Sequence, residues 1–394
     1  MLVLRDAIDK SEHNFTLSNV SGADKKEFTL ISATSPGADI RFTLDPPAQA
    51  LPPGYTVSVY LFKNPFHTQS QVIDLRTDDR VNGNGKIGYM FSLEALFTPG
   101  ALQLDNHRYC YSHFGIEFLF GNSATLQTKV VELTGNIYSI MDFFDNDTIM
   151  LVLCNEFCNQ VVSFDINNYL SNLFLHGFTY FSNNSPIETV NDDAYLRNKY
   201  ESFTVPVIQS GIYPLRLAKA KIAICSEAYV IHLFKNLIQK NSDQVTRFLM
   251  LYQVVEIFMP KMIHLEVQQR VCNDLANLTT DKLKELVIGL TKHGELITAL
   301  LNRHAVPSNQ LSRLLLQEIL DFFIHVNHPE FQDPLRNANQ TLTDLFYAFR
   351  NKIVHEYRIL HAVGVDAQIT EAKISKINHL TEALVAETIT VFVG

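Results

Sequence analysis

The hydrophobic residues of this chain follow one period in its first half and another in its second half. Up to about residue 190, short apolar runs such as Glu27–Ile31 and Thr56–Phe62 are rich in β-branched and aromatic residues, as is typical of strands. After about residue 210, apolar residues recur every three or four positions, which indicates amphipathic helices. Because the two periods suit different packing layers, this change predicts separate domains.

The length of the chain allows this division, since 394 residues are enough for two domains. We expect an α+β multidomain protein with a β-rich, sandwich- or barrel-like domain at residues 1–190 and an all-α helical bundle at residues 211–394. A stretch that contains Pro and Asn predicts a linker at residues 191–210. Apolar residues make up 46% and charged residues 19%, so we expect packed cores rather than a disordered chain.

Turn-forming sequences divide the N-terminal half into strands. We expect turns at Ser35–Gly37 and Pro52–Gly54, and later strands at Ile116–Phe120, Thr128–Leu133, Thr148–Leu153 and Val161–Phe164. The segment Asn82–Gly85 predicts a hairpin, because both central residues of a type I′ turn need positive φ. An EF-hand calcium loop is excluded there, since Phe91 stands where a bidentate Glu is needed.

Helical spacing runs through most of the C-terminal half. We expect helices at Tyr213–Gln239, from a cap at Ser242 to just before Pro260, and at Asp281–Arg303, Ser308–Val326, Thr341–His361 and Thr370–Val391. The apolar faces of these helices need one another, which predicts a bundle.

The charge balance limits the kinds of partner that suit the chain. A formal net charge of −9 argues against a broad surface that binds nucleic acid without sequence preference. It leaves room for a small basic cleft, including one assembled from two subunits.

The cysteines and the apolar runs predict a cytoplasmic protein. The five cysteines form no CxxC pair, so we expect free thiols, and we interpret Cys154 and Cys158 as buried thiols rather than metal ligands. The first residues lack the pattern of a signal peptide, and no run of about 18 uncharged apolar residues occurs. We therefore expect no association with a membrane.

A polar motif lies beside the apolar stripe of the expected helix Thr341–His361. Asn351 and His355 are four residues apart, so their side chains share a helix face and can hydrogen-bond. Arg350 lies about 140° away from His355 around the helix axis. One helix therefore does not direct both side chains at one atom, whereas two copies about a two-fold axis can bring each Arg to the other copy's motif.

The string Arg350-Asn351-x3-His355-x-Tyr357 resembles the Arg-x4-6-His signature of the HEPN (higher eukaryotes and prokaryotes nucleotide-binding) superfamily. With Tyr357 it is similar to the longer form in HEPN toxins that are paired with minimal nucleotidyltransferases. Upstream, Leu251-Tyr252-x3-Glu256 resembles the "LYxxxE" helix of several prokaryotic HEPN proteins. The resemblance covers roughly residues 210–394 and none of the β-rich half.

The resemblance implies metal-independent cleavage of RNA by a homodimer, without a cofactor. Arg350, Asn351 and His355 would be the catalytic residues: His355 as general acid or base, Arg350 stabilising charge on the phosphorane, and Asn351 positioning His355. The chemistry suits these residue types, because histidine exchanges protons near neutral pH and arginine donates two hydrogen bonds to phosphate. Tyr357 matches the Tyr that nucleotidyltransferase antitoxins modify, or it continues the apolar stripe.

The expected function is that of an endoribonuclease acting in bacterial defence by abortive infection, or as a toxin. Its substrate would be RNA, with tRNA one candidate, and the β-rich domain would respond to a phage-derived trigger or an antitoxin partner. The alternative is a non-catalytic HEPN dimerisation or adaptor protein with a ligand-binding β domain.

Two histidine groups have a structural and a functional interpretation. His325 and His328, near Glu330 and Asp333, suggest a metal site, although a solvated helix terminus suits them better. The aromatic stretch between His107 and His113 is expected to be strand core rather than an RNA-stacking surface. No P-loop, GxGxxG or GxSxG motif occurs, so nucleotide hydrolysis and serine-hydrolase chemistry have no support.

Overall fold

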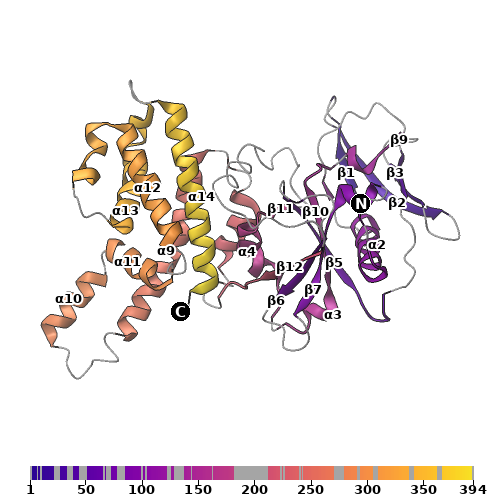
Figure 1. Ribbon diagram of the computed structural model, residues 1–394, viewed down its shortest axis with the longest axis horizontal. Helices are drawn as coiled ribbons and strands as arrows, with labels where there is room; N and C mark the ends of the chain where they lie inside the picture. Colours follow the sequence, from indigo (N-terminus) through magenta and orange to yellow (C-terminus); the bar gives the residue numbers. More distant parts are fainter. Residues whose placement is uncertain are drawn as a thin grey trace. The chain divides into compact units, whose positions relative to one another are not determined.

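A computed structural model gives the fold of the chain, which separates into two compact units (Figure 1). The first unit comprises Met1–Lys219 with Phe234–Lys240, and the second comprises Ala220–Leu233 with Asn241–Gly394. The first is β-rich and the second is largely helical, which confirms the predicted fold class. The structure describes residues 2–6, 8, 11–21, 27–32, 39–43, 51–64, 67, 72–77, 85–98, 101–102, 104–121, 126–127, 137–142, 144–161, 163–181, 212–221, 224, 227–238, 241, 243–269, 279–290, 293–304, 309–336, 341–361 and 366–392.

The described strands of the first unit form two six-stranded sheets. The first sheet has the order β8-β1-β2-β3-β4-β9, with β1 Leu2–Arg5, β2 Glu12–Ser21, β3 Glu27–Ser32, β4 Asp39–Thr43, β8 Leu126–Gln127 and β9 Ile137–Tyr138. The second has the order β11-β5-β10-β7-β6-β12, with β5 Val57–Lys63, β6 Val72–Thr77, β7 Lys86–Ser92, β10 Thr148–Cys154, β11 Thr179–Phe181 and β12 Ile212–Leu217. The short helical segments of this unit are α1 Leu93–Phe97, η1 Ile140–Asp142, α3 Asn155–Cys158, η2 Ile166–Tyr169 and α4 Leu170–Leu175.

The second sheet is organised around β10, which pairs antiparallel with both β5 and β7. Every residue of β10 is buried, as expected for a continuous apolar run in a central strand. The predicted strands Glu27–Ile31, Thr56–Phe62 and Thr148–Leu153 are thus confirmed by β3, β5 and β10. The predicted strand Thr128–Leu133 lies outside the described residues, and among the described residues of Val161–Phe164 only Val161 forms a bridge.

Helix α2 (Asn106–Gly121) corrects the predicted strand at Ile116–Phe120. The helix contacts β2 of the first sheet and β5, β10 and β7 of the second, and Tyr111 and Phe120 join the core cluster that includes residues of both sheets. A helix that is covered on more than one side carries no amphipathic period, so its sequence looks like a buried strand. Figure 1 shows α2 beside β2 and β5.

Two predicted turns can be compared with the structure. Pro52–Gly54 forms a turn in which the Tyr55 amide donates to the Pro52 carbonyl at 3.0 Å and Gly54 has a φ of 84°. The predicted hairpin is confirmed by the antiparallel pairing of β6 with β7, although residues 78–84 of the connection lie outside the described residues. The predicted turn at Ser35–Gly37 also lies outside them.

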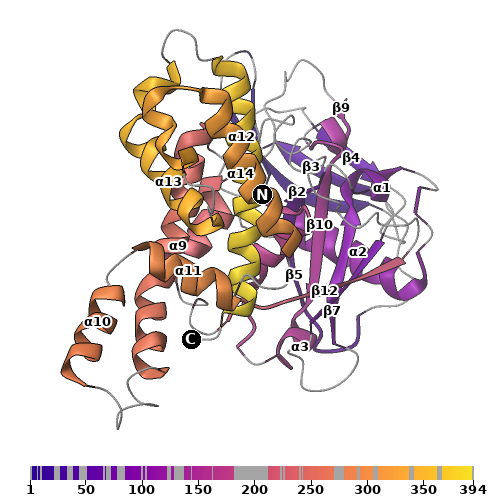
Figure 2. The ribbon, with the colours of Figure 1, turned by 60° about the vertical axis from the view of Figure 1, so that its left-hand side comes forward.

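The second unit is a packed set of helices. Helix α9 contacts α14, α11 and α13, and α12 contacts α14 and α13 (Figures 1 and 2). The described helical segments of this unit are α7 Ala228–His232, α9 Gln244–Val267, α10 Thr280–Leu290, α11 His293–His304, α12 Asn309–Val326, η7 Pro329–Phe331, η8 Asp333–Arg336, α13 Leu342–His355, η9 Tyr357–His361 and α14 Ala367–Val391. The π-helical η4 Leu233–Leu237 follows α7 and belongs to the first unit from Phe234 onward.

Helix α9 begins and ends differently from the prediction. Asp243 caps it by accepting from the Thr246 amide at 2.6 Å, and the helix continues through Pro260. Pro260 removes one backbone donor, but the buried Met259 and Met262 on either side hold the helix in the bundle. Among the described residues, α9 alone is long and apolar enough to cross a membrane by length and composition. The absence of membrane association therefore stays a prediction.

Other boundaries of the predicted elements are also corrected. The predicted helix Tyr213–Gln239 is wrong at its start, because Ile212–Leu217 is the edge strand β12, paired in parallel with β6. Leu215 and Leu217 are buried while Pro214 and Arg216 are exposed, which is the alternation of a strand. The single helix predicted at Asp281–Arg303 is divided into α10 and α11, whereas α12 and α14 confirm the last helices of the bundle within a few residues. The predicted linker at residues 191–210 lies outside the described residues.

Candidate functional site

Helix α13 carries the polar motif and is fixed at its start by a capping box. The Thr341 hydroxyl accepts from the Asp344 amide at 3.2 Å, and the Asp344 carboxylate accepts from the Thr341 amide at 3.2 Å. Of the apolar stripe predicted from Leu342 to Leu360, Leu345, Phe346, Phe349, Ile353 and Leu360 are buried, whereas Leu342 is half-buried. This packing fixes the rotation of α13 and hence the direction in which Arg350 extends.

Arg350 extends toward α9, where it meets the second segment that resembles the HEPN superfamily. Its guanidinium lies 3.6 Å from Oε1 of Glu256 and 5.5 Å from the centre of the Tyr252 ring. Tyr252 and Glu256 are one helical turn apart on α9, so they present adjacent side chains to Arg350. The fold thus brings together two motifs that lie far apart in the sequence.

The contacts of Arg350 combine a charge pair, an aromatic ring and an amide. Its side chain is 27% exposed, that of Glu256 is 38% exposed, and its Nη1 donates to Oδ1 of Asn351 at 3.1 Å. A half-buried guanidinium held in this way keeps donors for a further ligand, because it has five N–H groups in all. The arrangement orients the cation without removing it from solvent.

Tyr252 forms the apolar side of this site. The side chain is 2% exposed, and its hydroxyl has no hydrogen-bond partner within the part of the chain that the structure describes. Burial raises the pKa of Tyr252 above the ordinary value of 10.0, although nearby Arg350 acts in the opposite direction. Tyr252 is therefore a neutral phenol at physiological pH and supports Arg350 through its ring.

His355 is the last residue of α13, and its side chain is exposed. The structure gives no hydrogen bond between Asn351 and His355 among the described residues, and Oδ1 of Asn351 accepts from Nη1 of Arg350. Asn351 is therefore a neighbour of the Arg350 cation and is not a support for His355.

Tyr357 follows the helix rather than continuing it. Helix α13 ends at His355, Glu356 is its C-cap, and Tyr357 is the first residue of the 3-10 helix η9. The prediction of one helix to His361 is therefore wrong. Ile359 and Leu360 are both buried, and the tighter turn of η9 accommodates two adjacent inward residues.

A single chain consequently separates the two groups that the HEPN resemblance assigns to catalysis. Arg350 is directed at Glu256 and Tyr252, while His355 is exposed at the helix end. Tyr252 and Glu256 were not among the site residues predicted from the sequence. Their spacing of four on an apolar helix was the available signal, but it did not indicate which helix would lie opposite.

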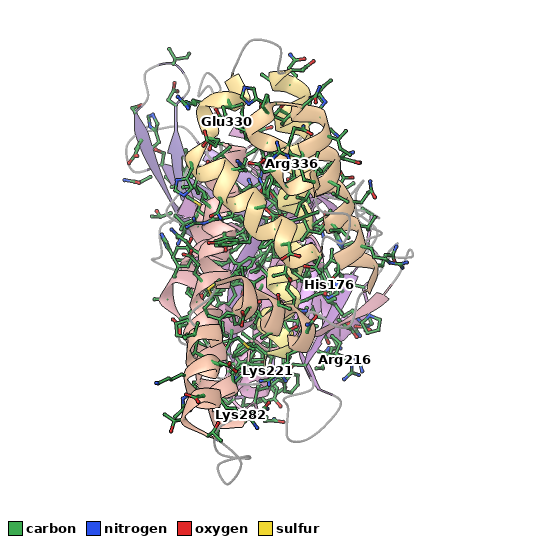
Figure 3. The ribbon with its side chains drawn as sticks, turned by 90° about the vertical axis from the view of Figure 1, so that its left-hand side faces the viewer. His176, Arg216, Lys221, Lys282, Glu330 and Arg336 are labelled. Carbon is green, nitrogen blue, oxygen red and sulfur yellow. The ribbon has the colours of Figure 1, made fainter. Side chains whose placement is uncertain are left out.

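The two histidines proposed as metal ligands lie at the end of α12 and just after it. Helix α12 ends at Val326, and Nδ1 of His328 accepts from the Glu330 amide at 3.4 Å, which confirms the helix terminus. Figure 3 shows Glu330 and Arg336 toward one end of the helical unit and Lys282 toward the other. No group of three or more potential metal ligands occurs among the described residues, and the described cysteines Cys110, Cys154 and Cys158 are free and buried.

The first unit contains a polar cluster that sequence reasoning missed. Asp74 is 5% exposed and lies 3.3 Å from both Lys86 and Arg108, while Oη of Tyr89 lies 2.6 Å from Nδ1 of His107. Burial lowers the pKa of His107. These contacts join the start of α2 to β6 and β7, so the cluster positions the helix against the second sheet.

The chain was also compared with known proteins. No protein-family model, no curated protein and no solved structure matches it.

Proposed function

We propose that this protein is a metal-independent endoribonuclease of the HEPN type that acts in bacterial defence or as a toxin and is regulated by its N-terminal unit. The observation that supports this most directly is the pairing of Arg350 with Glu256. The two residues belong to separate segments that each resemble the same superfamily. If the likeness of either segment to the superfamily were a coincidence, there would be no reason for the two segments to contact each other.

The proposed chemistry is transfer of the RNA phosphate to its own ribose. His355 removes the proton from the 2′-hydroxyl and the 2′-oxygen forms a bond to phosphorus. The bond to the 5′-oxygen breaks as that oxygen takes a proton from water or from the imidazolium that His355 has become. Arg350 donates hydrogen bonds to the phosphorane oxygens. Glu256 and Asn351 hold the guanidinium, and Tyr252 closes one side of it.

The separation of Arg350 from His355 supports a site that is built from two chains. In a homodimer formed through the helical unit, Arg350 of one chain and His355 of the other would act on one phosphate. Each dimer then contains two equivalent sites. The substrate is RNA, with tRNA as a candidate. A single guanidinium at each site needs no broad basic surface, which suits a protein whose net charge is −9.

Cleavage of total cellular RNA by the purified chain tests this proposal. Wild-type protein should produce new RNA fragments, whereas Arg350→Ala and His355→Ala should each reduce their formation by about a hundredfold or more, because each removes a group that stabilises the transition state. Samples are compared with and without phage infection, so that a required trigger is present in one arm. Identical RNA fragment profiles from wild type and both variants in every arm would contradict the nuclease proposal.

Mixing the two inactive variants tests the two-chain site. If Arg350 and His355 act across the dimer, an equal mixture should recover about a quarter of the wild-type activity, since half the dimers are mixed and each has one intact site. A mixture that stays as inactive as its components, although native mass spectrometry shows mixed dimers, would refute the shared site.

A non-catalytic adaptor is the second candidate, and the exposure of His355 favours it. In the described chain His355 has no hydrogen bond to Asn351 that would fix its imidazole. An adaptor would dimerise through the helical unit while the β-rich unit binds a ligand. Growth after overexpression separates the two candidates, because ribonuclease toxicity should disappear with Arg350→Ala, and an adaptor has no such dependence.

A further inference from the structure

The first unit contains a polar cavity of about 490 Å³ on the second sheet. Strand β5 and the end of β10 form its floor, and α3 with the segment that leads into η2 forms its wall. Its volume is within the usual range for sites that bind small molecules. The cavity is lined by Ser58, Tyr60, Leu153, Asn155, Cys158, Asn159, Val161, Ser163, Phe164, Asp165 and Ile166.

Several polar side chains of this cavity have unused hydrogen-bonding capacity. Ser58 and Asn155 are already bonded to each other at 2.7 Å. In contrast, the structure gives the side chains of Tyr60, Asn159 and Ser163 no hydrogen bond to another described residue. Within the part of the chain that the structure describes, Asp165 accepts hydrogen bonds only through Oδ1, from the amide and the side chain of Asn167 at 2.9 Å each. Its second oxygen, Oδ2, is left to accept from a ligand.

The charge of the lining restricts the class of ligand. Asp165 is the one charged side chain among the lining residues, and none of them is cationic. The ammonium of Lys219 lies 3.4 Å from the Ser163 carbonyl oxygen, but Lys219 is outside the lining. A phosphate in the cavity would face the carboxylate of Asp165, and no lining side chain offers it a guanidinium or an ammonium. The lining therefore favours an uncharged ligand that presents N–H donors to Asp165.

Aromatic rings give the cavity flat apolar surface. Phe164 and Tyr60 both line it, and the Phe164 ring stacks on Tyr169 at 5.5 Å with an interplanar angle of 28°. That stacking holds Phe164 in place, so the ring presents a fixed surface to the cavity. Aromatic surface beside hydrogen-bonding side chains suits a planar heterocycle, because its face stacks while its edge is hydrogen-bonded.

We propose that this cavity binds an uncharged aromatic heterocycle with amino or ring N–H groups, of the nucleoside class, with Asp165 accepting from its edge and Phe164 and Tyr60 packing on its face. No covalent step is involved. The proposal does not depend on the ribonuclease activity of the helical unit, since all the lining residues belong to the first unit.

Calorimetric titration of the full-length chain tests the proposal with guanosine, adenosine, cytidine and uridine, with their 5′-monophosphates, and with glucose as an uncharged polyol. At least one nucleoside should bind more tightly than its monophosphate and than glucose. Asp165→Asn should weaken that affinity by about tenfold or more, because it replaces a charge-assisted hydrogen bond with a neutral one. Asn is also a competent cap for η2, so this variant should fold.

A matched control separates loss of the site from loss of folding. Asp142→Asn changes another exposed carboxylate that caps a turn, with Oδ2 accepting from the Ser139 amide at 2.8 Å, and it lies outside the cavity lining. The affinity of Asp142→Asn for the nucleoside should equal that of the wild type. The proposal is overturned if no nucleoside binds, if Asp165→Asn binds as tightly as Asp142→Asn, or if the monophosphate or glucose binds at least as well as the nucleoside.

Chemical labelling of the cysteine thiols tests whether the nucleoside binds in this cavity. Cys158 and Cys110 are each 5% exposed, but only Cys158 lines the cavity. A nucleoside in the cavity should slow the reaction of Cys158 with N-ethylmaleimide by at least severalfold and leave Cys110 unchanged, as measured by peptide mass spectrometry. Equal effects on both thiols, or no effect on Cys158 at saturating nucleoside, would show that the ligand binds elsewhere and overturn the assignment.

Discussion

The pair formed by Arg350 and Glu256 contributes little to stability and much to orientation. Both side chains are partly exposed, so water screens the attraction, and such pairs typically stabilise a fold by about 0–1 kcal/mol. The direction of the guanidinium is nevertheless set by this carboxylate together with the Tyr252 ring. Substitution here should therefore separate an effect on activity from an effect on folding.

Glu256→Gln tests the positioning role within the proposed ribonuclease. The expected result is RNA cleavage slowed by about tenfold with a thermal midpoint close to that of wild type, because positioning is lost while the packing is retained. Glu256→Asp should recover part of the rate. Glu285→Gln on α10 is the control, since that side chain is exposed and lies on a different helix. If Glu256→Gln cleaves RNA as fast as this control, Glu256 has no positioning role.

Arg247 and Glu382 form a second charged pair, whose loss is expected to affect stability rather than the orientation of a site residue. Their side chains are 3% and 1% exposed, and Nε of Arg247 lies 2.9 Å from Oε1 of Glu382. Arg247 also donates to the Asn241 carbonyl at 2.8 Å. Removal of one partner leaves a buried charge without its counter-charge, which is far more costly than removal of both.

Arg247→Met and Glu382→Leu should each reduce the free energy of unfolding by about 3–5 kcal/mol, and the double variant should be more stable than the worse single variant. Chemical denaturation monitored by circular dichroism gives the three values. Additive losses in the double variant would show that the two side chains act independently.

At the scale of elements, the packing of α2 depends on its small residues. A Cβ at Gly115 would lie 2.6 Å from Cγ2 of Val152 on β10, which is too close for any ordinary contact. The glycine therefore lets the helix approach the sheet, although glycine lowers helix propensity relative to alanine by about 1 kcal/mol.

Gly115→Ala should destabilise the protein by about 1–3 kcal/mol, because overpacking outweighs the gain in helix propensity. Gly294→Ala is the matched control in a helix, since a Cβ there meets nothing within 4 Å. Gly294→Ala should leave the thermal midpoint unchanged or raise it slightly. Thermal unfolding compares the two variants, and equal midpoints would contradict the close approach of α2 to β10.

At the scale of the whole molecule, half-buried His176 predicts a dependence of stability on pH. Burial lowers its pKa below the ordinary value of 6.5, so the unfolded chain takes up a proton first as the pH falls. The contribution of His176 to stability is therefore fully present above pH 6.5 and declines below it, until the folded chain is protonated too.

His176→Gln should make the free energy of unfolding fall less steeply than in wild type as the pH drops below 6.5. Denaturation at a series of pH values measures the slope. Burial raises the pKa of Glu387 and gives a contribution of opposite sign, so the difference between variant and wild type isolates His176. His264→Gln, an exposed histidine of α9, is the control. Identical slopes for the two variants would count against the effect of burial at His176.

The sequence alone determined the order of the two structural classes and much of the helical bundle. Hydrophobic periodicity is a local property, so it located β3, β5, β10, α12 and α14. It also identified the buried face of α13, because residues three and four apart share a helix face whatever packs against it. The capping of that helix by Thr341 and Asp344 is equally local.

Only the tertiary structure decided which elements meet, and hence the content of the candidate site. α2 lacks an amphipathic period because both sheets contact it. β12 was not predicted, because the helix expected from Tyr213 onward included Pro214, which lies instead in an edge strand. The pairing of Arg350 with Glu256, and with it the loss of Asn351 as a partner for His355, depends on the packing of α9 against α13. Periodicity shows which face of a helix is buried, but it contains no information about the residue that will lie opposite.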